Sequence, residues 1–144
     1  MYAEDIDGDG VMELPSLITM KRISPEHEEK QKFLIRWFAM DLEGREMDKL
    51  FTFHNYLGGW YMQLASSWAA RVSVDQDGGR YTFYVWDEDY RQALDVFSIY
   101  VLTGGSREED ATVDGRFAFY RAEGVVYAAK LEANAAGFGI TENQ

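Results

Sequence analysis

The sequence contains no cysteine, only two prolines, and no apolar run near the roughly 20 residues of a membrane-spanning helix. The absence of cysteine excludes disulfide scaffolds, thiolate metal sites and cysteine nucleophiles. The first residues, Met1 to Glu4, lack the basic and apolar regions of a signal peptide. We therefore expect no thiol chemistry and no membrane insertion of this stretch of chain.

Positive charge is also scarce. The chain has 14 Lys and Arg residues against 25 Asp and Glu, which gives a net charge of −11. Because the acidic residues are spread along the chain, nucleic acids and anionic membranes are poor partners. Divalent cations and protein or glycan partners remain, and the sequence leaves the oligomeric state open.

The 144 residues fit one domain of ordinary size, and an aromatic content of 15% favours sheet-rich packing. Residues 1–32 read as a polar lead-in, and residues 33–144 as a single α+β domain. Hairpins are expected over 33–54, 72–86 and 116–131, with 96–102 as a central strand. Short helices are expected near 24–26, 66–70, 87–94 and 132–144. The predicted fold class is α+β, a mainly antiparallel sheet of six to seven strands with a few short helices packed to one side.

The most specific motif is an acidic loop at the N-terminus. Carboxylates stand at relative positions 1, 3, 5 and 9, with glycines between them, at Asp5, Asp7, Asp9 and Glu13. Calcium prefers six to eight hard oxygen ligands, and alternating carboxylates on a tight loop converge on one ion. An EF-hand needs Glu at position 12 of its loop, which is Ser16 here, so that class of site is excluded. A metal-free acidic turn is the alternative.

The shorter ending at position 9 resembles the calcium loops of FG-GAP and VCBS-type repeats of β-propellers and bacterial surface proteins. The resemblance implies a structural calcium ion held by Asp5, Asp7, Asp9, the backbone carbonyl of Val11, and Glu13. It also implies a secreted or lipid-anchored, extracytoplasmic location. Because the loop begins so near Met1, we expect the sequence to be a piece of a longer protein with further domains before it.

A second resemblance covers residues 56–131. An extended segment ending at Gln63-Leu64-Ala65, then Ser67-Trp68, a hairpin over 72–86 and a strand over 97–101 resemble clostridial lipoprotein domains related to the PsbP-like fold. Ala65 departs from that pattern, which has proline there. The resemblance implies a sheet packed against helices and no enzymatic chemistry.

Other candidates for function are less specific. Exposed aromatic side chains stack on sugars, so the aromatic stretch is a candidate ligand surface formed by Tyr56, Trp60, Tyr61 and Trp68. His54 with Ser66 or Ser73 as a nucleophile lacks the framing turn of a hydrolase. The acidic clusters 87–89 and 108–110 could supply carboxylates for glycoside hydrolysis, but solvated surface explains them better.

The sequence therefore predicts a non-enzymatic, extracytoplasmic binding or interaction module of a larger bacterial surface protein or lipoprotein, with a calcium-type structural loop. The alternatives are a glycan-active hydrolase and a carbohydrate-binding domain.

Overall fold

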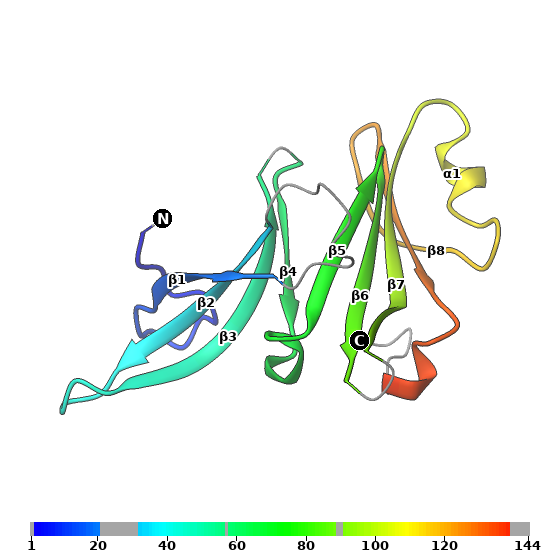
Figure 1. The fold of residues 1–144 in the computed structure, drawn as a ribbon. Helices are drawn as coiled ribbons and strands as arrows, with labels where there is room; N and C mark the ends of the chain where they lie inside the picture. Colours follow the sequence, from blue (N-terminus) through cyan, green and yellow to red (C-terminus); the bar gives the residue numbers. More distant parts are fainter. Residues whose placement is uncertain (1, 21–31, 57, 89–90, 139–144) are drawn as a thin grey trace. The chain divides into compact units, whose positions relative to one another are not determined.

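The computed structural model describes residues 2–20, 32–56, 58–88 and 91–138 (Figure 1). The chain divides into two compact units, each of which is built around its own sheet. Among the described residues, the first unit holds 2–20 and 32–71, and the second begins at Val72. The two units are described separately below.

The sheet of the first unit is a four-stranded antiparallel meander in chain order. Its strands are β1 (Leu14–Thr19), β2 (Phe33–Met40), β3 (Glu46–Asn55) and β4 (Trp60–Leu64), followed by the 3₁₀ turn η1 (Ser66–Trp68). The hairpin between β2 and β3 turns at Asp41, whose side chain accepts the backbone N–H groups of Glu43 and Arg45. The boundary expected after residue 32 falls between two paired strands, β1 and β2.

One face of this sheet carries a buried apolar cluster. Ile35, Trp37 and Leu50 form it, and Ile6 of the N-terminal loop packs against them. The indole nitrogen of Trp37 donates to the buried hydroxyl of Thr52 at 2.8 Å, so the polar atom of this large side chain has a partner. Ile6 therefore holds the N-terminal loop on the face of the sheet.

A β-bulge interrupts the pairing of β2 with β3. Trp37 lies opposite Leu50, but the next residue, Phe38, lies opposite Asp48, which leaves Lys49 without a partner residue on β2. Bulges bend a strand and redirect the side chain of the extra residue. The bulge thus gives Lys49 a direction that regular alternation along β3 would not give it.

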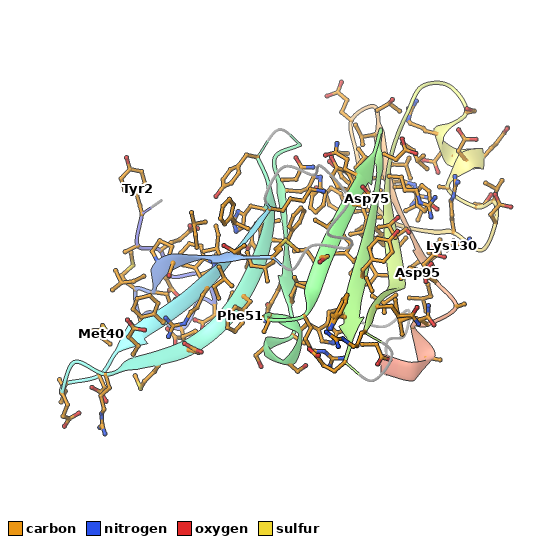
Figure 2. All side chains as sticks on the ribbon, in the orientation of Figure 1. Tyr2, Met40, Phe51, Asp75, Asp95 and Lys130 are labelled. Atoms are coloured by element: carbon orange, nitrogen blue, oxygen red, sulfur yellow. The ribbon has the colours of Figure 1, made fainter. Side chains whose placement is uncertain are left out.

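The second unit contains a five-stranded antiparallel sheet in the order β5-β6-β7-β9-β8. Its strands are β5 (Val72–Asp77), β6 (Arg80–Asp87), β7 (Gln92–Thr103), β8 (Phe117–Ala122) and β9 (Val125–Leu131). The short helix α1 (Arg107–Asp110) lies between β7 and β8, and the 3₁₀ turn η2 (Ala136–Phe138) follows β9. Figure 2 draws the side chains, including labelled Asp95 on β7, whose carboxylate accepts the side-chain amide of Asn134 at 2.7 Å.

Close packing of aromatic and β-branched side chains holds this second sheet together. Phe83 and Val85 are fully buried, and the ring of Phe83 stacks on that of Phe97 at 4.7 Å. Between β6 and β7, the buried hydroxyls of Thr82 and Ser98 share a hydrogen bond of 3.1 Å. Ser98 also donates to the carboxylate of Glu132 at 2.8 Å. The hydroxyls of Thr82 and Ser98 and the carboxylate of Glu132 therefore supply hydrogen-bond partners for one another.

The predicted α+β class is wrong. Strand accounts for 57% of the described structure and helix for 7%, and the strands form two antiparallel sheets of four and five strands instead of one sheet covered by helices. Over the described residues α1 is the only α-helix, and it has four residues. The helical layer implied by the PsbP-like resemblance is likewise contradicted.

Strand pairing explains why the helix expected at 87–94 does not form. Residues 87–94 carry an acidic start typical of a helix, yet Asp87, the last residue of β6, pairs with Gln92, the first residue of β7. Each residue added to that hairpin gains ladder hydrogen bonds, which a short isolated helix cannot match. Residues 66–68 form only a 3₁₀ turn, and of 132–144 the described part forms η2. The helix expected at 24–26 lies outside the described residues.

Other expectations hold. The three predicted hairpins are confirmed as β2–β3, β5–β6 and β8–β9, and the strand predicted at 96–102 is confirmed at the centre of its sheet as part of β7. None of the helices in the described stretches is both long and apolar enough to cross a membrane.

The approach of Gly79 to β7 predicts a stability effect. A Cβ at Gly79 would lie 2.6 Å from the backbone oxygen of Val101, so we expect Gly79→Ala to lower the free energy of unfolding by about 1–3 kcal/mol. Gly105→Ala is the control, because a Cβ there meets no atom within 4 Å. Urea denaturation followed by circular dichroism measures both, and equal midpoints for the two variants would contradict the described packing.

Candidate metal centre

The N-terminal loop is closed at its base by two backbone hydrogen bonds. The amide of Glu4 donates to the carbonyl of Glu13 at 3.0 Å, and the amide of Glu13 donates to the carbonyl of Glu4 at 2.9 Å. Between these residues the chain turns at Gly8 and Gly10, whose φ angles of 75° and 87° are ones that other residues rarely adopt. A short antiparallel bridge therefore fixes both ends of the acidic loop.

Three carboxylates of the loop are each oriented by a backbone N–H group. Asp5 Oδ2 accepts the amide of Gly10 at 2.9 Å, and Asp7 Oδ1 accepts the amide of Asp9 at 3.1 Å. Glu13 Oε2 accepts the amide of Ile6 at 3.1 Å. Hydrogen bonds to a charged acceptor are stronger than neutral ones, so these contacts hold the carboxylates in place.

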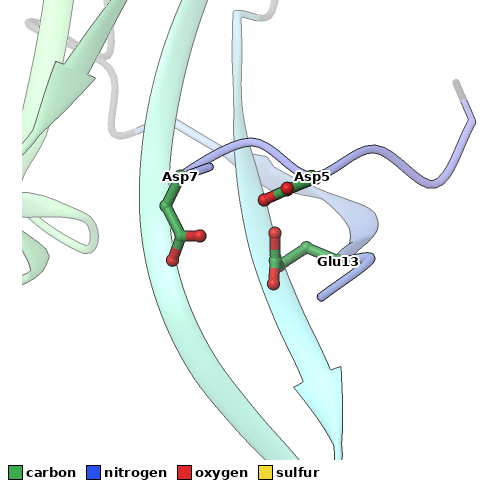
Figure 3. A group of neighbouring side chains, drawn as sticks. All are labelled: Asp5, Asp7 and Glu13. Carbon is green, nitrogen blue, oxygen red and sulfur yellow. The ribbon is translucent and has the colours of Figure 1, made fainter. Parts of the chain in front are cut away.

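The same three carboxylates converge. One oxygen from each of Asp5, Asp7 and Glu13 lies within 4.8 Å of the others. Figure 3 shows the three carboxylate groups turned toward one another. Glu13 is completely buried, Asp5 is partly buried and Asp7 is exposed, so the cluster opens to solvent on the side of Asp7.

Two oxygens of the cluster have no hydrogen-bond partner. Asp5 Oδ1 and Glu13 Oε1 are both buried, and no described residue donates to either. Buried charges in proteins are normally paired or bound to a metal, because the loss of hydration costs several kcal/mol per ion. Like charges this close also repel. A positive group bound by these carboxylates would lower both costs.

The cluster fits a calcium ion. Calcium binds oxygen at about 2.3 to 2.6 Å, so two of its ligands lie at most about 5 Å apart. The separation of the three oxygens meets that condition. The donors are all hard carboxylate oxygens, and no nitrogen or sulfur ligand lies among them, which suits calcium better than zinc or copper.

Asp9 lies outside this three-carboxylate group. Its Oδ2 is 2.8 Å from the ammonium of Lys49, and its Oδ1 accepts the amide of Val11 at 2.8 Å. The hydrogen bond from Lys49, followed by that from the Val11 amide, holds the pKa of Asp9 below its usual range. Val11 itself is exposed, and ligation by its carbonyl stays a prediction.

Lys49 is the functional residue that sequence reasoning missed. It lies 40 residues from Asp9, and nothing in its local sequence distinguishes it from any surface lysine on a strand. The bond to Asp9 raises the pKa of Lys49, and the negative charges of Asp7 and Glu13 add to the effect. Its ammonium therefore responds to two carboxylates of the cluster as well as to Asp9.

The predicted aromatic surface is only partly assembled. Tyr56 and Tyr61 are exposed and lie on the ring of His54, with centroids 5.5 Å and 5.0 Å away. Trp60 precedes Tyr61 on β4, so it points to the opposite face, where its ring packs 5.9 Å from Phe53. Trp68 is half-buried in η1. Tyr56 and Tyr61 are thus the two members that share one exposed surface.

His54 takes part in a hydrogen-bonded chain. Its Nε2 lies 2.7 Å from Thr52 Oγ1, which already accepts the indole N–H of Trp37. All three groups are satisfied when the Thr52 hydroxyl donates to a neutral His54. Burial lowers the pKa of His54 and outweighs the opposite effect of the Glu4 charge. The ring therefore has a structural partner where a hydrolase would need a nucleophile.

The acidic clusters proposed for glycoside hydrolysis have other contacts. Glu108 is held by Arg121 through contacts of 2.9 to 3.1 Å, and Asp110 accepts the hydroxyl of Ser106 at 2.8 Å. Asp89 of the other cluster lies outside the described residues. These contacts give no support to a pair of carboxylates facing each other across a cleft.

No protein-family model, no curated protein and no solved structure matches the chain. The resemblances of the acidic loop to FG-GAP and VCBS-type loops, and of residues 56–131 to clostridial lipoprotein domains, stay predictions.

The half-buried His54 predicts a pH dependence of stability. Because the pKa of folded His54 lies below the value of 6.5 of an unperturbed histidine, the unfolded chain binds more protons between these two values. Stability should therefore fall as the pH drops from about 7 through that interval. His54→Gln should remove this part of the decline, measured as the difference in urea midpoint from the parent between pH 7 and pH 5. Identical pH profiles for the two proteins would contradict the assignment.

Proposed function

We propose that this chain is a calcium-binding β-domain in which Asp5, Asp7 and Glu13 hold a structural ion on the first sheet. The observation that carries the proposal is Glu13, a fully buried carboxylate with an oxygen that no described residue pairs. A surface acidic turn that stays metal-free would leave its carboxylates in water. A bound divalent ion would neutralise the buried charges and satisfy both orphan oxygens.

The residues around the centre support a structural role for the ion. The amides of Ile6, Asp9 and Gly10 orient the three carboxylates before any ion arrives. Because Ile6 also packs on Trp37 and Leu50, ordering of the loop stabilises the apolar face of the sheet. Calcium would therefore strengthen the first unit as a whole.

An extracytoplasmic location follows as part of the proposal. A site with three carboxylates, one of them exposed, resembles the weaker calcium sites of extracellular modules, whose dissociation constants are about 10⁻⁴ to 10⁻³ M. In that setting the chain would serve as a binding or interaction module of a secreted or lipid-anchored protein. The exposed rings of Tyr56 and Tyr61 are the best-supported surface for a protein or glycan partner.

The test compares how calcium changes the stability of the parent and of a Glu13 variant. In buffer without divalent ions, Glu13→Gln should raise the free energy of unfolding by about 1–3 kcal/mol, because it removes an unpaired buried carboxylate next to other carboxylates. Calcium at 100 times its dissociation constant should stabilise the parent by about 2.7 kcal/mol and the variant by far less. Thermal and urea denaturation with and without calcium measure both effects.

Glu43→Gln is the matched control. Glu43 belongs to the same unit, but its side chain is 67% exposed and contacts only Arg45 among the ion pairs of the described residues. It should gain as much from calcium as the parent does. A parent whose stability does not change with calcium, or a Glu13 variant that gains as much as the parent, would overturn the proposed function.

A further inference from the structure

A lysine ammonium lies at the rim of the candidate calcium centre. Lys49 Nζ is 2.8 Å from Asp9 Oδ2, and the backbone amide of Asp9 donates to Asp7 Oδ1 at 3.1 Å. One residue thus separates the ammonium from a carboxylate of the centre. The same group of carboxylates includes Glu13, one oxygen of which is buried and unpaired.

The fold brings the Lys49 ammonium into contact with the N-terminal loop. The bulge in β3 leaves Lys49 without a partner residue on β2. Its side chain reaches the same loop whose Ile6 packs against the apolar cluster that contains the neighbouring Leu50. The Lys49 side chain is 28% exposed and that of Asp9 is 38% exposed. Both residues are exposed, so the effect of the pair depends on its short distance and is screened by salt.

We propose that Lys49 is a built-in counter-cation that competes with the bound divalent ion for the acidic loop and lowers the affinity of the site. This inference rests on the proposed calcium function. Without an ion, the ammonium offsets part of the repulsion among the carboxylates and stabilises the loop. With an ion, the ammonium and the ion repel each other, because Lys49 already responds to the charges of Asp7 and Glu13. Binding of the ion must overcome that repulsion.

Competition of this kind gives Lys49 a specific role in the affinity. The resemblance of the loop to repeat-type calcium loops implies Asp9 as a ligand, and Asp9 is the carboxylate that Lys49 holds. Lys49 therefore weakens ion binding in two ways: its charge repels the ion, and its ion pair with Asp9 occupies a candidate ligand. A purely positioning residue would have the opposite effect, because its loss would weaken the ion site.

The experiment is a calcium titration by isothermal calorimetry on the parent chain and three variants. Lys49→Gln should bind calcium roughly three- to ten-fold more tightly than the parent, from the removal of one charge at short range. Lys49→Arg keeps the charge and should bind like the parent. Arg45→Gln, which removes a positive charge from the hairpin between β2 and β3 of the same unit, should also bind like the parent.

Salt separates charge competition from loop positioning. At high potassium chloride the difference between Lys49→Gln and the parent should shrink, because the repulsion is screened. Binding by the parent with Lys49→Gln unchanged or weaker would overturn the inference and leave the calcium site intact. Binding by Lys49→Gln alone would support the inference, whereas no binding by any of the four proteins would contradict both the inference and the proposed function.

Discussion

The burial of one carboxylate, that of Glu13, is the constraint on which the N-terminal part of the structure depends. Its backbone is fixed by the two hydrogen bonds with Glu4, and its side chain is fully enclosed. One of its oxygens takes the Ile6 amide, and the other has no partner among the described residues. Since an unpaired buried carboxylate is costly, this oxygen is the main support for the proposed cation.

The loop and the sheet depend on each other through two contacts of different physical kinds. Ile6 contributes apolar burial against the cluster around Trp37, and Lys49 contributes a charge contact with Asp9. Both sheet residues that matter, Lys49 and Leu50, are consecutive on β3, and a bulge lets both serve the same face. A cation bound by the loop is therefore coupled to the apolar packing of the first unit and to a competing charge from it.

The sequence predicted the local features better than the distant ones. The alternating spacing of the acidic loop singled out four carboxylates. The structure brings together Asp5, Asp7 and Glu13, because short-range turns decide their geometry, and leaves Asp9 outside the group. Lys49 carried no signal, since its role depends on a bulge and on a contact 40 residues away. The helix expected at 87–94 was wrong for a related reason: its acidic start is a local preference, which the pairing of β6 with β7 overrides. Trp60 and Tyr61 were grouped as neighbours, but strand alternation places them on opposite faces.

The most direct test of the central claim is a calcium titration followed by ¹H–¹⁵N correlation spectra. The amides of Ile6, Asp9 and Gly10 donate to the three carboxylates of the centre, so each should shift along one common saturable curve. The amide resonances of β5 to β9 should not shift. If the three loop amides remain unmoved at about 10 mM calcium, above the weakest range known for extracellular sites, the loop does not hold the ion and the account is contradicted.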